Sequence, residues 1–123
     1  LALGLAVAQP APSVTAIEGD GAGLMRLGPW PAHGNARPAN LRHALIDNHV
    51  HDSTGGQSSL SGTVDFCALA AGCGYAGVER LADPAAFASW ADATYDGPAF
   101  LHARRACTWV TVIEPSSPLE SGV

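Results

Sequence analysis

Oxygen-bearing side chains stand at two points where the chain leaves a short apolar segment. Residues 13–18 alternate small and β-branched side chains, as a strand does, and lead into the Gly-Asp-Gly sequence at 19–21. A second strand-like segment, residues 41–46, leads into Asp47 and Asn48. In open α/β sheets, ligands bind at the carboxyl ends of parallel strands. The sequence therefore predicts a ligand site at this edge of a sheet.

The glycine turn has the features of a phosphate-binding turn that works with a cation. Apolar residues at helical spacing follow it in residues 22–27, and a glycine turn that opens a helix offers backbone N–H groups to an anion. The carboxylate of Asp20 would repel a phosphate unless a divalent cation lay between them. Mg²⁺ suits this position, because it binds a few protein oxygens together with substrate phosphates.

Residues 48–62 form a long polar stretch rich in glycine, serine and threonine. A loop of this length in a compact domain usually covers a ligand, so residues 53–56 are candidates to line an anionic group. His51 is the candidate catalytic residue because imidazole titrates near neutral pH. The alternatives are a solvent-exposed loop and a histidine without a chemical role. The other histidines lack metal-ligand spacing and are expected to be surface or structural residues: His33, His43, His49 and His102.

The composition limits the class of protein. A chain of 123 residues is expected to form one domain, and its net charge of -5 without a basic cluster excludes nucleic acid as a partner. Residues 1–8 are apolar but too short to span a bilayer, so no membrane partner is expected. The three cysteines form no Cys-x-x-Cys pair, which favours reduced thiols in a cytoplasmic protein over a disulfide framework or a zinc site.

Helical and strand-like segments alternate along the chain. Helices are expected at 1–8, 22–27, 63–71 (capped by Ser61 or Thr63) and 84–91 (capped by Asp83), and strands at 13–18, 41–46, 77–81 and 99–103. This order predicts an α/β three-layer sandwich with a mostly parallel sheet, in which strand 13–18 is central. Residues 28–38 are interrupted by glycine and proline, and no element is predicted there. Residues 106–123 are expected to form a divergent, flexible tail.

The turn at 19–21, the interval 22–46 and the pair Asp47-Asn48 resemble the diphosphate-binding signature of thiamine diphosphate enzymes. The run His-Asp-Ser-Thr-Gly-Gly-Gln at 51–57 is similar to the phosphonopyruvate decarboxylase branch of these enzymes, with sulfopyruvate decarboxylases close by. The resemblance implies a thiamine diphosphate-binding fold over residues 1–105. Because the chain begins within the first expected helix, it is interpreted as a partial domain, truncated at its N-terminus.

The resemblance also implies thiamine diphosphate and Mg²⁺ as cofactors. It assigns the metal to the side chains of Asp20 and Asn48 and to the backbone carbonyl of Val50. The implied cofactor contacts are Gly19, Asp20, Gly21, Ala22, Asn48, Ser53, Thr54 and Gly55.

The reaction implied by the resemblance is the decarboxylation of a small 2-oxo acid, with phosphonopyruvate giving phosphonoacetaldehyde in phosphonate biosynthesis. A separate pyrimidine-binding domain or subunit would supply an activating glutamate, so a homo- or hetero-oligomer is expected. This chain would provide the diphosphate-binding half-site and would be inactive alone. The alternatives are a sulfopyruvate decarboxylase beta-type subunit, an inactive fragment, and a dinucleotide-binding domain in which Asp47 contacts the ribose.

Overall fold

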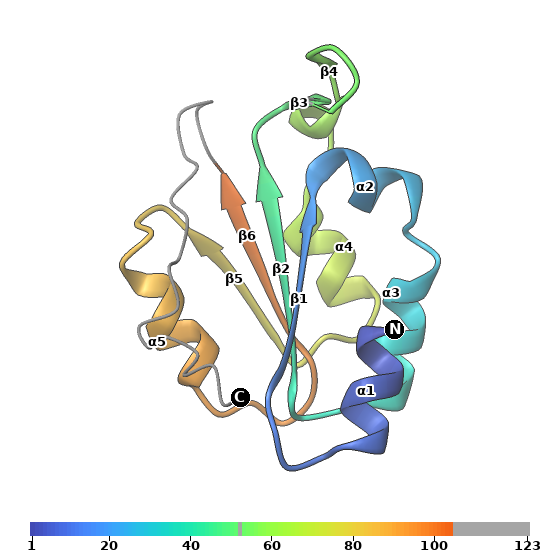
Figure 1. The fold of residues 1–123 in the computed structure, drawn as a ribbon, viewed down its shortest axis with the longest axis vertical. Coiled ribbons are helices and arrows are strands. Elements are labelled where there is room, and N and C mark those ends of the chain that lie inside the picture. The colour runs from blue at the N-terminus through green and yellow to red at the C-terminus, as the bar shows by residue number, and fades with distance from the viewer. Residues whose placement is uncertain (52, 105–123) are drawn as a thin grey trace, which may run out of the picture.

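Four parallel strands form the central sheet of the computed structural model, which describes residues 1–51 and 53–104. In their order across the sheet these are β1 (Val14–Gly19), β2 (Leu41–Asp47), β6 (Ala99–Arg104) and β5 (Gly77–Leu81). All four point the same way, so their carboxyl ends share one edge (Figure 1). The predicted mostly parallel sheet is confirmed, and each predicted strand lies within one residue of its observed bounds. The expected tail at 106–123 lies outside the described residues.

Short helices connect the strands. They are α1 (Ala2–Ala8), α2 (Asp20–Met25), α3 (Pro29–Ala36), α4 (Phe66–Gly72) and α5 (Ala86–Asp92), with a 3₁₀ turn, η1 (Ser61–Thr63). The polar stretch after β2 contains an antiparallel ribbon of two very short strands, β3 (Val50–His51) and β4 (Gln57–Ser58). This ribbon projects from the carboxyl edge of the sheet (Figure 1).

Apolar side chains cover both faces of the sheet, because successive residues of a strand point to opposite faces. On one face, Leu45 and Phe100 pack with Trp30 of α3 and Phe66 of α4. On the other face, Ala44, Ala99 and Leu101 pack with Trp90 of α5. Helices therefore flank the sheet on both sides, which is the predicted three-layer α/β arrangement (Figure 1).

The structure corrects the prediction of no element at 28–38, because α3 occupies this segment. Pro29 stands at the first position of the helix, where the missing N–H costs nothing. Trp30 is 1% exposed and belongs to the core. A Cβ on Gly34 would overlap the backbone carbonyl of Cys73, so this glycine lets α3 approach the end of α4 closely. The proline and glycine that suggested a loop are therefore the residues that allow α3 to begin and to pack closely.

Three further expectations differ in detail. The strand at the start of the sheet, β1, pairs only with β2 within the described part of the chain and lies at an edge, not in the centre. Helix α2 begins at Asp20 and not at residue 22, so Asp20 is its first residue. Helix α4 is capped by Asp65, whose Oδ1 accepts a hydrogen bond from the backbone N–H of Ala68 at 3.1 Å. The predicted caps, Ser61 and Thr63, form η1 instead.

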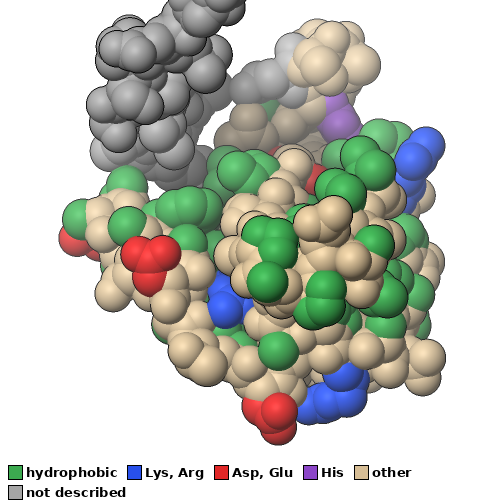
Figure 2. Space-filling model, turned by 60° about the horizontal axis from the view of Figure 1, so that its bottom comes forward, with side chains coloured by type: hydrophobic (Ala, Val, Ile, Leu, Met, Phe, Trp, Pro, Cys, Tyr) green, Lys and Arg blue, Asp and Glu red, His purple; other side chains and the backbone are tan. Residues whose placement is uncertain are grey.

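The surface carries isolated apolar side chains. Those of large size that are exposed are Leu1, Leu5, Val7, Ile17, Met25, Ile46 and Leu60. On the face shown in Figure 2, apolar side chains lie among scattered acidic and basic groups, and the basic groups do not form a stripe. Among the described residues, the helices are all too short or too polar to cross a membrane.

Candidate functional site

Asp20 is buried at the carboxyl edge of the sheet. It follows Gly19, which pairs with Ile46, so the residues after β1 and β2 leave the sheet side by side. The Asp20 side chain is 2% exposed, and Ser59 donates a hydrogen bond from its hydroxyl to Oδ2 of this carboxylate. A carboxylate is buried at a cost unless it is paired with a donor or a cation. Asp20 is therefore a buried, hydrogen-bonded carboxylate and not an exposed turn residue.

Ser59 is a site residue that the sequence analysis missed. Its backbone N–H donates to the carbonyl of His49 at 3.0 Å, which ties together the two ends of the ribbon formed by β3 and β4. Nothing in the run of serines around it indicates which hydroxyl faces Asp20, because that contact joins residues far apart in the chain.

Asn48 and Val50 form a tight turn directly after β2. The backbone N–H of Val50 donates to Oδ1 of Asn48 at 3.2 Å, and His49 between them has a φ of 66°, in the left-handed region. The two oxygen-bearing groups assigned to a metal thus lie within one short turn. This turn leaves the same edge of the sheet as Asp20, so the structure brings the predicted ligand positions to one end of the fold.

His51 lies against the glycine turn. A Cβ built on Gly21 would lie 2.5 Å from Nδ1 and 2.6 Å from Cε1 of the His51 ring. Glycine at position 21 is therefore required for this approach. The structure places the candidate catalytic histidine beside Gly21, one of the predicted cofactor contacts.

The residues 53–55 lie in the exposed turn between β3 and β4. The backbone N–H of Thr54 and that of Gly56 donate to the carbonyl of His51, at 3.2 and 2.9 Å. The Thr54 hydroxyl also donates to Oε1 of Gln57 at 3.2 Å. These hydrogen bonds stay within the ribbon, which projects from the carboxyl edge of the sheet (Figure 1).

The Asp47 carboxylate is buried and hydrogen-bonded to neighbouring protein groups. It is 1% exposed, with His102 Nε2 at 2.9 Å from Oδ2 and the backbone N–H of His49 at 3.1 Å from Oδ1. Burial alone would raise the pKa of Asp47, but hydrogen bonds from His102, Ser61 and His49 outweigh it and lower this pKa below its usual value. Asp47 is thus a charged residue that ties the end of β2 to β6.

A buried chain of polar groups runs through the core behind the site. Oε1 of Glu18 lies 2.7 Å from Nε2 of His43, and Nδ1 of His43 lies 2.7 Å from the Tyr75 hydroxyl. The same hydroxyl lies 2.7 Å from Nδ1 of His33. With both imidazoles neutral, His33 donates to Tyr75, Tyr75 to His43, and His43 to Glu18. Glu18 immediately precedes the glycine turn, so the chain connects that turn to α3.

The expected structural role of His33 and His43 is thus observed, but their connection was not foreseen. Strand periodicity could have indicated that His43 is buried, because it lies on the same face of β2 as Leu41 and Leu45. Cys67 and Cys73 are free, partly buried thiols, and Cys107 lies outside the described residues.

The comparison with sequence models of protein families matches residues 1–103 to the family described as "Thiamine pyrophosphate enzyme, C-terminal TPP binding domain". The chain belongs to this family, as the predicted resemblance indicated. The fold agrees with that assignment.

The chain is also similar in sequence to individual decarboxylases. The chain is 48% identical over 103 residues to the phosphonopyruvate decarboxylase of Streptomyces viridochromogenes and 47% identical over 103 residues to that of Streptomyces hygroscopicus. It is 35% identical over 102 residues to sulfopyruvate decarboxylase subunit beta of Methanothermobacter thermautotrophicus. These alignments cover 81% of this chain for the first two relatives and 83% for the third. The aligned part is 25% of the length of each Streptomyces relative and 53% of the length of the beta subunit.

Proposed function

We propose that this chain supplies the diphosphate-binding half of the active site of a thiamine diphosphate-dependent 2-oxo acid decarboxylase. The observation that carries the proposal is the buried carboxylate of Asp20 beside the glycine turn, at the edge where Asn48 leaves β2. Membership of the thiamine diphosphate-binding family supports the same ligand. Thiamine diphosphate, when bound, supplies a nucleophilic carbon and an electron sink for loss of the carboxylate.

The residues at this edge fit a magnesium ion. The donors would be the Asp20 carboxylate, the Asn48 amide oxygen and the carbonyl of Val50, an all-oxygen set of the kind that Mg²⁺ prefers together with phosphate oxygens. A cation beside Asp20 would also offset the cost of burying its charge, in addition to the hydrogen bond from the Ser59 hydroxyl. The metal would neutralise the diphosphate and hold it against the turn.

The backbone of the glycine turn and the imidazole ring of His51 would have different roles at the site. The N–H groups of Gly19, Gly21 and Ala22 would bind diphosphate oxygens, since α2 begins directly at this point. Ser53, Thr54 and Gly55 would close over the phosphates from the ribbon. His51, whose ring lies beside Gly21, would hold or release a proton at Nδ1 next to the bound cofactor.

The activating glutamate is proposed to come from a pyrimidine-binding domain or subunit. Both glutamates in the described part of the chain have other partners: Glu18 accepts from His43, and Glu79 accepts from the Tyr95 hydroxyl, each at 2.7 Å. A site shared between two such domains would require a homo- or hetero-oligomer. Residues 1–105 alone are expected to bind the diphosphate end of the cofactor without turnover.

Phosphonopyruvate is the proposed substrate, with phosphonoacetaldehyde and carbon dioxide as products. The identity of 48% to a phosphonopyruvate decarboxylase supports it over sulfopyruvate, which the 35% identical beta-subunit relative suggests as a second candidate. Rates with the two acids, measured on the assembled enzyme, decide between them. The partly buried free thiols Cys67 and Cys73 suit a cytoplasmic enzyme.

Thermal melting of the full chain tests the cofactor proposal, because a ligand that binds only the folded state raises the melting temperature. A shift that requires thiamine diphosphate and Mg²⁺ together is expected, and it should disappear in Asp20→Asn and Asn48→Ala. An equal shift with NAD, or no shift in a chain that melts cooperatively, would overturn the proposal.

A further inference from the structure

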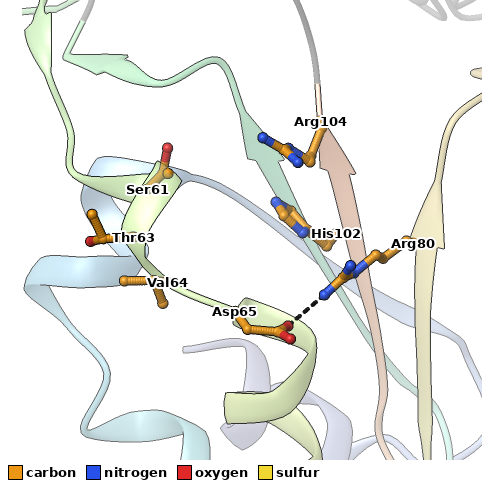
Figure 3. Close-up of a pocket in the computed structure, with 8 residues that line it drawn as sticks. Ser61, Thr63, Val64, Asp65, Arg80, His102 and Arg104 are labelled. Carbon is orange, nitrogen blue, oxygen red and sulfur yellow. Dashed lines mark hydrogen bonds and ion pairs between the residues drawn. The ribbon is translucent and has the colours of Figure 1, made fainter.

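A pocket of about 240 Å³ lies beside the proposed cofactor site, at the carboxyl ends of β5 and β6. Figure 3 shows it between η1 with the start of α4 on one side and the two strands on the other. The residues that bear on its chemistry are Ser61, Thr63, Asp65, Arg80, His102 and Arg104. None of the cofactor contacts predicted from the sequence belongs to its lining.

The sheet geometry brings three basic side chains to this pocket. Arg80 pairs with His102 in the parallel register of β5 and β6, so their side chains share one face of the sheet. Arg104 follows His102 by two residues and lies on the same face. All three side chains extend from the strands toward η1 and α4 (Figure 3).

His102, which lines the pocket, has a ring nitrogen without a hydrogen-bond partner in the part of the chain that the structure describes. Its side chain is 5% exposed, and its Nε2 lies 2.9 Å from Oδ2 of Asp47. Its Nδ1 is buried and has no hydrogen-bond partner among the described residues. Buried polar atoms nearly always have a partner, so this nitrogen indicates a ligand. Because Nε2 donates its hydrogen to Asp47, Nδ1 of the neutral ring is a hydrogen-bond acceptor.

The two arginines make the pocket attractive to anions. Nη2 of Arg80 donates to Oδ1 of Asp65 at 2.7 Å, and Nη2 of Arg104 lies 3.4 Å from Nε2 of His49. A guanidinium has five N–H donors, so both retain donors for a ligand. Two arginines and one carboxylate, that of Asp65, belong to the lining of the pocket, in a chain whose net charge is -5.

We propose that this pocket binds a small phosphoryl or phosphonyl group that still carries one proton, in a subsite distinct from that of the cofactor diphosphate. The two guanidinium groups bind the unprotonated oxygens, and the remaining O–H donates to Nδ1 of His102. An anion of the same shape without a proton, such as sulfate, gives Nδ1 nothing to accept. The acceptor nitrogen between two cations therefore selects phosphate-type groups over sulfate-type groups.

Titration of the full-length chain with inorganic phosphate, methylphosphonate and sulfate, followed by isothermal calorimetry and by the NMR signals of the His102 ring, tests the proposal. Phosphate and methylphosphonate are expected to bind and to shift the ring signals, with sulfate at least about tenfold weaker. Arg104→Gln should weaken phosphate binding by about tenfold or more, since it removes a charge-assisted contact. Arg26→Gln removes the same charge from the exposed end of α2 and should leave phosphate binding unchanged.

The proposal would be overturned by equal affinity for sulfate and phosphate, by equal loss in the two arginine variants, or by no binding to the folded chain. Displacement of phosphate by thiamine diphosphate with Mg²⁺ would show that the pocket is part of the cofactor site, and would equally overturn it. The titrations need no cofactor, so their failure leaves the melting experiment on Asp20 unaffected.

Discussion

Nδ1 of His43 lies 2.7 Å from the hydroxyl oxygen of Tyr75, within the core between β2 and helices α3 and α4. Tyr75 is 6% exposed and bridges His43 and His33. Burial, followed by the charge of Glu18, raises the pKa of the Tyr75 hydroxyl well above its usual value. The phenol therefore stays protonated and acts as a fixed link between the two rings.

Tyr75→Phe should destabilise the chain, because it leaves a buried nitrogen of each histidine without its partner. We expect a loss of about 1–3 kcal/mol in the free energy of unfolding, measured by urea denaturation. Tyr95→Phe is the matched control, since it removes one exposed hydrogen bond to Glu79 and should cost no more than about 1 kcal/mol. Equal costs in the two variants would contradict the role of the buried chain.

The stability should fall as the pH drops below about 6.5, the ordinary pKa of histidine. Burial, followed by the charge of His43, lowers the pKa of His33 in the folded chain. The unfolded chain therefore takes up this proton first, and each further drop in pH favours unfolding until the lowered pKa is passed. His33→Asn keeps a donor for Tyr75 but cannot titrate, so its denaturation midpoint should depend less steeply on pH between 6.5 and 5. An unchanged slope would show that His33 does not contribute.

Gly34→Ala tests the packing of α3, which the sequence did not indicate. A Cβ at this position would overlap the carbonyl of Cys73, and a backbone atom cannot move aside as a side-chain tip can. We expect a loss of about 1–3 kcal/mol in the free energy of unfolding. Gly72→Ala, in α4, has open space around the new methyl group and should leave the stability equal or slightly higher. A Gly34→Ala chain as stable as the Gly72→Ala chain would contradict the observed helix contact.

Gly21→Ala tests the approach of His51 to the turn. The new methyl group would displace the imidazole, which can swing away, so the melting temperature should change little. Thiamine diphosphate affinity in the presence of Mg²⁺ should fall by about tenfold, because the methyl group also narrows the space over the turn. Gly4→Ala, on α1, meets no atom within 4 Å and is the control for a neutral glycine replacement. Unchanged affinity in Gly21→Ala would exclude a close contact at this position.

The sequence predicted the strands well because each is a short segment with apolar or β-branched residues, bounded by glycine, proline or polar residues. Residues 77–81 and 41–46, for example, coincide with β5 and all but the last residue of β2. It did not indicate that β1 is an edge strand, since the order of strands depends on contacts between distant segments. The sequence also did not indicate α3. Proline and glycine are typical of loops, but here Pro29 begins the helix and Gly34 lies at its contact with the end of α4.

The sequence could predict those features of the candidate site that depend only on where the parallel strands end. The residues after two parallel strands must share an edge, so Asp20 and Asn48 were expected at one edge, and the pairing of Gly19 with Ile46 agrees with that position. The partners of these residues were not predictable. Ser59 reaches Asp20 across 39 positions of sequence, and His102 reaches Asp47 across 55. Such contacts depend on the packed tertiary structure and leave no local pattern.

A calorimetric titration of thiamine diphosphate into the full chain, with and without Mg²⁺, directly tests the proposed metal–diphosphate site. Binding should require the metal, and Asp20→Asn should weaken it by about a hundredfold or more, since it removes the buried carboxylate that would hold the cation. Asp92→Asn removes an equal charge from the exposed end of α5 and should bind as the unaltered chain does. Binding of equal strength without Mg²⁺, or in a folded Asp20→Asn chain, would contradict the proposed metal–diphosphate site.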